Sequence, residues 1–169
     1  MTTDGHDRPN PLSDPDFVAG LRPVPTGVPG EAPDWPAADL RGVRPDGSAV
    51  SVALAGLDRP LLLLFLAVHC DGCESFWRGL GDADDPSVAG VVTVAVTKGP
   101  DSVDAAEVDS LATAFTGDVV MGDAPWTDYR VTGYPFLVLV EPGPRRILAE
   151  AVGFGWADVA SVVRRGLGR

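Results

Sequence analysis

The stretch FLAVHCDGCESFW, residues 65–77, decides the fold of this chain. It joins the end of an apolar run, residues 61–68, to a Cys-Asp-Gly-Cys motif, and a helical pattern follows the motif. The run is too short for an ordinary buried helix and is apolar on both faces, which is typical of a central strand of a sheet. The sequence therefore places two cysteines at the junction of a buried strand and a helix.

Cys70 and Cys73 are the two cysteines of the chain. A disulfide between them would close a very small loop, so it would restrict the unfolded chain little and add little stability. In a reducing compartment, such a pair points instead to metal or redox use. Zinc takes four ligands, and His69 with two thiolates leaves one position open unless a second copy fills it. We interpret the pair as redox-active, with an inert relic of a redox fold as the alternative.

Strand and helix patterns alternate outward from this motif. Strands are expected at residues 48–54, 61–68, 91–97, 119–121, 136–140 and 146–152, and helices at 74–80, 101–115, 126–131 and 156–165. Asp46 and Gly47 mark a tight turn before the first strand, and the last two strands are expected to pair as a hairpin. This alternation predicts an α/β architecture, a central mixed sheet flanked by helices.

Composition divides the chain into an arm and one domain. Residues 1–37 are rich in proline and poor in large apolar side chains. Such a segment cannot bury enough apolar surface to offset the entropy of ordering, so we expect it to be disordered or loosely docked. Residues 38–169 fit a single domain, and 45% hydrophobic residues in the chain suffice for a sizeable core.

The chain is acidic, with a net charge of −11 from 24 acidic and 13 basic residues. This balance repels polyanions, so no nucleic-acid partner is expected. The apolar runs are far shorter than the ~20 residues of a membrane-spanning helix, so no span is expected. The first residues also lack the basic and apolar regions of a secretory signal. If Met1 is the native start, we expect a cytoplasmic location.

Two segments carry a resemblance to a known family. Residues 65–77 resemble the active-site strand and helix of thioredoxin-like proteins. The segment YRVTGYPFLVLV, residues 129–140, resembles their second signature, a loop that ends in a cis-proline facing the cysteines. Residues 46–57 are similar to the lead-in of the TlpA-type branch, the bacterial thiol–disulfide reductases. The extra strand–helix insertion of that branch would correspond to about residues 91–115.

The resemblance covers about residues 38–168. It implies a thioredoxin-like fold with an N-terminal strand or hairpin extension, and exchange of dithiol and disulfide with protein clients. The implied partners are protein thiols or disulfides and an electron donor or acceptor. No organic cofactor or metal is implied, because the sulfurs carry the electrons. The Pro-x-x-x-Thr-x-x-Cys motif of peroxiredoxins fits neither cysteine, so peroxidase activity is not expected.

The resemblance also implies roles for individual residues. Cys70 would be the nucleophile, Cys73 the more buried resolving thiol, and Pro135, in cis, would shape a client groove. A helix N-terminus beside Cys70 lowers its pKa and favours the reactive thiolate, whereas the carboxylate of Asp71 opposes a neighbouring thiolate. We therefore expect a modestly lowered pKa for Cys70 and a reducing or intermediate potential. The supporting or client-binding candidates are His69, Asp71, Gly72 and Tyr134.

Three positions depart from the family pattern. Thioredoxin has a buried acid six residues before its first cysteine, and this chain has Leu64 there. His69 replaces the usual tryptophan before the first cysteine, and Tyr134 replaces a small or β-branched residue before the proline. We interpret His69 as a packing or orienting residue rather than an acid–base catalyst, and Tyr134 as either packed or contacting the client. These departures support an alternative, an accessory or binding module with little or no redox turnover.

Overall fold

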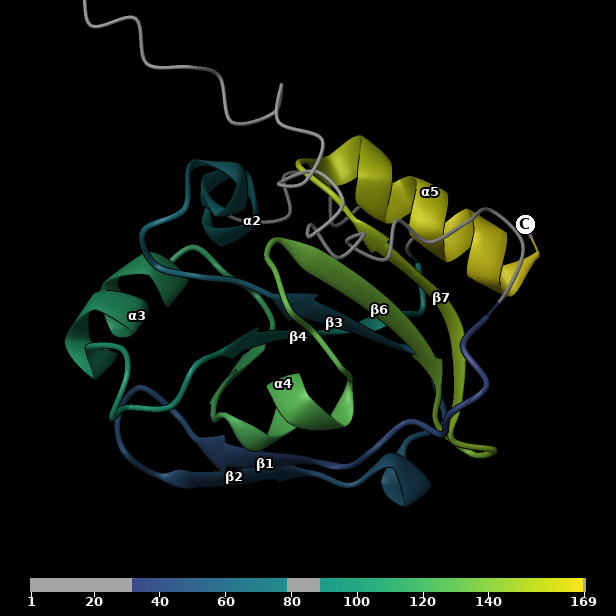
Figure 1. Cartoon of the computed structure of the whole chain (residues 1–169), viewed down its shortest axis with the longest axis horizontal. Helices are drawn as coiled ribbons and strands as arrows, with labels where there is room; N and C mark the ends of the chain where they lie inside the picture. Colours follow the sequence, from purple (N-terminus) through teal and green to yellow (C-terminus); the bar gives the residue numbers. More distant parts are fainter. Residues whose placement is uncertain (1–31, 79–88, 169) are drawn as a thin grey trace, which may run out of the picture.

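The structure is a computed structural model and describes residues 32–78 and 89–168. In these residues, a seven-stranded mixed sheet has the strand order β2-β1-β5-β4-β3-β6-β7. The strands are β1 Leu40–Val43, β2 Ala49–Val52, β3 Leu61–Phe65, β4 Val92–Thr97, β5 Asp118–Met121, β6 Phe136–Glu141 and β7 Arg146–Val152. The helices are η2 Leu54–Gly56, η3 Asp71–Cys73, α2 Glu74–Trp77, α3 Ala105–Ala112, α4 Ala124–Asp128 and α5 Trp156–Leu167 (Figure 1).

Strand β3 lies in the middle of the sheet, parallel to β4 and antiparallel to β6. All five of its residues are buried. Because successive side chains of a strand point to opposite faces, an all-apolar strand can serve two cores at once. The expected central strand is therefore confirmed, and the cysteines follow directly from its carboxyl end.

The two faces of the sheet are covered by different helices. On one face, Leu61, Leu63 and Phe65 pack with Trp126 and Tyr129 of the α4 region. On the other face, the core contains Leu62 and Leu64 of β3 with the side chains of α2, α3 and α5. Each buried leucine of this kind contributes about 1.5–3 kcal/mol relative to an exposed one, so β3 anchors both layers.

The N-terminal hairpin extension is present as β1 and β2, paired antiparallel. The expected turn lies between them: Gly47 has a φ of 83°, and the Ser48 amide donates to Asp46 Oδ1 at 2.8 Å. The expected hairpin of β6 and β7 is also present. Strand β1 was not predicted, because its four residues, LRGV, show no period of two.

Several expected elements differ in their bounds. Helix α3 spans Ala105–Ala112 rather than residues 101–115, because Asp104 caps it by accepting a hydrogen bond from the Ala106 amide at 2.9 Å. Helix α4 begins at residue 124 rather than 126, with Pro125 in its first turn. The expected strand 48–54 ends at residue 52 and gives way to the short helix η2. Helix α2 ends at Trp77 rather than at residue 80, with Arg78 as its C-cap, and residues 79–80 lie outside the described residues.

Of the proline-rich arm, residues 1–31 lie outside the described part, and residues 32–37 run along the domain. The Ala37 amide donates to the Arg145 carbonyl at 2.8 Å, and Pro36 forms an isolated bridge with Arg146. The ring of Trp35 lies 4.2 Å from the Arg130 guanidinium carbon. None of the helices in residues 32–78 and 89–168 has the length and apolar character that crossing a bilayer takes.

Candidate active site: the Cys70–Cys73 disulfide

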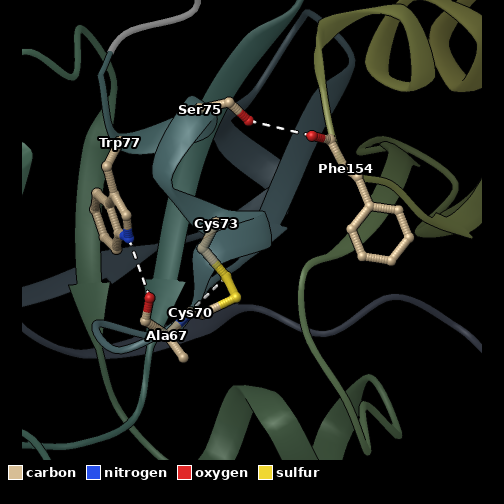
Figure 2. Close-up of a disulfide and its surroundings, with 6 residues drawn as sticks. All are labelled: Ala67, Cys70, Cys73, Ser75, Trp77 and Phe154. Carbon is tan, nitrogen blue, oxygen red and sulfur yellow. Dashed lines mark hydrogen bonds between the residues drawn. A yellow bond between two sulfur atoms is a disulfide. The ribbon is translucent and has the colours of Figure 1, made fainter.

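Cys70 and Cys73 form a disulfide at the point where β3 leads into α2, with their Cα atoms 5.2 Å apart (Figure 2). Cys70 has an extended backbone and is the N-cap of η3, and the Cys73 amide donates to the Cys70 carbonyl at 2.9 Å. Cys73 is fully buried, whereas Cys70 is partly exposed. One sulfur can therefore meet a partner while the other lies behind it.

The chain segment that follows β3 contacts the buried sulfur of Cys73. The Ala67 amide donates to Cys73 Sγ at 3.5 Å, and the Trp77 indole donates to the Ala67 carbonyl at 3.2 Å. Trp77 and Phe76 are buried in the core. These two hydrogen bonds place Cys73 Sγ against the backbone that leads away from β3.

Pro135 and Gly72 bring a second loop against the cysteines. The Tyr134–Pro135 peptide bond is cis, and Pro135 is buried. A Cβ atom placed on Gly72 would lie 3.4 Å from Pro135 Cδ and 2.9 Å from Phe154 Cδ1. The absence of a side chain at Gly72 thus allows both rings to approach the cysteine loop.

Phe154 was not found from the sequence. Its amide donates to Asp158 Oδ2 at 2.8 Å, and its carbonyl accepts from Ser75 Oγ at 3.3 Å. Its backbone is thus fixed on both sides while its ring is 67% exposed, and Figure 2 shows the ring and Trp77 on opposite sides of the cysteine loop. Gly153 and Gly155 flank Phe154 in the sequence, and this pattern could have indicated that Phe154 lies in an exposed loop.

Tyr134 lies on the rim of the same site. Its ring is 52% exposed and meets the buried Trp126 edge-on, with ring centroids 6.2 Å apart. Among the described residues, Tyr134 and Phe154 are the large apolar side chains that remain exposed. One edge of Tyr134 therefore packs and the rest of its ring faces solvent, and its contact with a client stays a prediction.

His69, expected to pack or to orient a neighbour, does not pack. Its side chain is 85% exposed and its Nδ1 lies 3.4 Å from Glu107 Oε1 of α3. Asp71, in the loop between the cysteines, is exposed as well. Leu64, at the position of the family's buried acid, is completely buried. In the described part of the chain, no group of three or more His, Cys, Asp or Glu side chains is placed to hold a metal ion.

No protein-family profile matches this sequence, and a search of curated proteins finds no related sequence. Solved structures do match. The thioredoxin domain of a thiol-disulfide oxidoreductase from Bacteroides vulgatus is 18% identical with a TM-score of 0.58, over 79% of this chain and 99% of that one. A thioredoxin-family thiol:disulfide interchange protein from Chlorobium tepidum is 20% identical with a TM-score of 0.58, over 82% of this chain and 100% of that one.

A secreted disulfide oxidoreductase of Mycobacterium tuberculosis, homologous to DsbE of E. coli, is 14% identical with a TM-score of 0.56, over 73% of this chain and 93% of that one. At such identities the similarity establishes the fold. The chain therefore has the thioredoxin-like fold of these solved thiol–disulfide oxidoreductases, with a disulfide-bonded Cys-x-x-Cys pair in it.

Proposed function

We propose that this protein is a thiol–disulfide oxidoreductase that exchanges disulfides with protein clients and acts mainly in the reducing direction. The observation that carries the proposal is the unequal exposure of two bonded cysteines at the start of a helix, Cys70 open and Cys73 buried. Exchange needs one accessible thiolate to attack and a second thiol nearby to resolve the intermediate.

The reduced form carries out the reaction in two steps. The Cys70 thiolate attacks one sulfur of a client disulfide, which forms a mixed disulfide and releases one client thiolate. Cys73 then attacks the Cys70 sulfur, so the Cys70–Cys73 bond forms and the second client thiolate leaves. Two electrons pass to the client, and a dithiol reductant restores the pair. Cys73 lies too deep to bind a client directly, which suits it to the second step only.

The client would lie as an extended segment over Pro135, between the exposed rings of Tyr134 and Phe154. Exposed aromatic side chains on fixed backbone bury apolar surface at small entropic cost. The hydrogen bonds from Ser75 and to Asp158 fix the backbone of Phe154 in this way. We infer that both rings contact the client beside its cysteine.

The reducing direction is supported by charge. Asp71 lies between the cysteines, and a carboxylate there disfavours the thiolate of the reduced form. A reduced form that is not stabilised gives up its electrons readily, so we expect a reducing or intermediate potential. Redox titration in glutathione buffers tests this, and a value near that of the strong oxidants, about −120 mV, would contradict it.

The activity is tested by reduction of insulin with dithiothreitol as the reductant. The parent chain accelerates precipitation of the insulin B chain, and Cys70→Ser abolishes the acceleration because the attacking sulfur is lost. Cys73→Ser retains the first step only, so it accumulates mixed disulfides with clients in cells. A Cys70→Ser variant as active as the parent would exclude the proposed mechanism.

A second candidate is a thioredoxin-fold binding module with little turnover. Leu64 favours it, because a fully buried leucine cannot relay the proton that the family's acid handles. Alkylation by iodoacetamide across pH separates the two functions. A Cys70 pKa near the unperturbed value of about 8.5, together with no insulin reduction, would favour the module.

A further inference from the structure

A cavity of about 430 Å³ opens beside residues 66–69, the segment that leads from β3 to Cys70. Its walls come from the residues after β3, from the residues after β4, from the start of α3 and from Trp126 of α4. Strands β3 and β4 are parallel, and ligand sites in such sheets lie at the carboxyl ends of adjacent strands. The volume is within the range of sites that bind small molecules or several side chains.

The cavity is continuous with the proposed client site at two points. Ala67, whose amide contacts Cys73 Sγ, is part of its wall. Tyr134, which directly precedes Pro135, is part of its rim. An extended client segment that lies over Pro135 therefore passes Tyr134 and can place a neighbouring side chain in the cavity.

Lys98, the single lysine of the chain, lines this cavity. Its ammonium lies 4.7 Å from the centre of the Trp126 ring and 3.7 Å from Asp123 Oδ1. Both contacts are longer than a hydrogen bond, so the three donors of the ammonium remain available to a ligand. The side chain is 45% exposed, so it can turn toward an incoming group.

The acidic side chains of the cavity wall are already engaged. Asp104 accepts the capping hydrogen bond of α3 from the Ala106 amide, and Glu107 pairs with His69. The acidic charge farther away is screened within about 8 Å at physiological salt. Lys98 is the permanently cationic side chain among the residues that line this cavity, and an anionic acceptor can pair with it.

We propose that this cavity binds an acidic side chain of the client, close in sequence to the reacting cysteine, through an ion pair with Lys98. The inference rests on the proposed function and names its preferred substrate class, client segments with Asp or Glu next to the cysteine. The methylene groups of that side chain lie against the apolar wall that includes Val103 and Trp126.

The test uses the full chain with dithiothreitol and short peptides that contain one cysteine, capped as a mixed disulfide with 2-mercaptoethanol. Each peptide carries Glu at one of the two positions on either side of the cysteine, and its partner peptide carries Gln. We expect about a fourfold lower KM for Glu at one of these positions, with kcat unchanged. Lys98→Gln removes the preference, and Lys98→Arg retains it.

Two further variants make the test specific. Asp123→Asn enlarges the preference for Glu, because it removes the carboxylate that competes for Lys98. Arg44→Gln is the matched control: Arg44 has a similar exposed ion pair, 3.6 Å from Asp118, at the other end of the sheet. It removes the same charge as Lys98→Gln and leaves the preference unchanged.

The outcomes separate the two proposals. Equal KM for Glu and Gln at every position, with insulin reduction intact, overturns the cavity assignment alone. An effect of Lys98→Gln on oxidised glutathione but on none of the peptides also overturns it, since the carboxylate would then belong to a small thiol. Failure to reduce insulin and every peptide contradicts the proposed function itself.

Discussion

At the scale of single residues, Gly72 controls how closely Phe154 approaches the cysteines. The position has room only for hydrogen: a Cβ would lie 2.9 Å from Phe154 Cδ1. The backbone of Phe154 is held by Asp158 and Ser75, so only its ring can give way. Because the ring is exposed, it can turn away without disturbing the core. We therefore expect a side chain at position 72 to affect client binding more than the free energy of unfolding.

We therefore predict that Gly72→Ala displaces the Phe154 ring and raises the KM for insulin several-fold. The free energy of unfolding changes by less than about 1 kcal/mol, because an exposed ring moves without opening the core. Insulin reduction and urea denaturation measure the two effects. Gly56→Ala is the control, since Gly56 also lies in a short 3-10 helix and a Cβ there meets nothing within 4 Å. An unchanged KM in Gly72→Ala would remove Phe154 from the client site.

At the scale of secondary-structure elements, the sequence predicts those elements that have a recognisable pattern within their own residues. Strand β3 was predicted from its unbroken apolar run, and the role of Pro135 was implied by the resemblance of residues 129–140 to the second thioredoxin-like signature. Phe154 and Lys98 could not be placed in this way, because their proximity to the cysteines comes from α5 and from the parallel pairing of β3 with β4. The same reason hides the contact of His69 with Glu107, which lies on α3. Contacts between distant segments leave no periodic trace in the sequence.

Asp39 joins three such segments. Its carboxylate accepts from the Leu54 amide at 2.9 Å and from the Arg145 guanidinium at 2.8 and 2.9 Å. It thereby connects the start of β1 to η2 and to the turn between β6 and β7. These hydrogen bonds, the Leu54 amide first and Arg145 second, lower the pKa of Asp39 below its ordinary value.

The lowered pKa predicts a stability that depends on pH. Because the folded chain binds the Asp39 proton less tightly than the unfolded chain, the contribution is complete above the unfolded pKa of about 3.9 and is lost as pH falls through the folded value. Asp39→Asn therefore lowers the unfolding midpoint at neutral pH, and its difference from the parent narrows in acid. Chemical denaturation of both chains at neutral pH and at acidic pH measures this difference. Asp118→Asn, with an exposed ion pair to Arg44, is the control, and a difference that is constant with pH would refute the argument.

At the scale of the whole molecule, the redox state of one pair bears on the stability of the fold. If the protein is a reductant, folding favours the disulfide over the dithiol, and by linkage the oxidised chain is the more stable. We predict that thermal unfolding of the oxidised chain has the higher midpoint. Unfolding with and without dithiothreitol measures the difference, and Cys70→Ser, which has no disulfide, shows no response. A more stable reduced form would indicate an oxidant.

The acidity of the chain and its location also belong to this scale. The net charge of −11 predicts repulsion of polyanions, whereas the cavity at Lys98 offers a local cation to the proposed client. The cytoplasmic location stays a prediction of the sequence. Fractionation of cells that express the full chain tests it, and recovery outside the cytoplasm would contradict it.

The burial of Cys73 behind Cys70 has a consequence under oxidative stress. If the proposed function holds, peroxide that reaches the reduced protein would meet Cys70 and convert it slowly to a sulfenic acid, without the rate of a dedicated peroxidase. The sheltered Cys73 thiol then condenses with it, forming the disulfide and releasing water, before further oxygen adds. Cys73 thus protects Cys70 from oxidation to the irreversible sulfinic and sulfonic acids. A dithiol then reduces the disulfide and returns both cysteines to thiols.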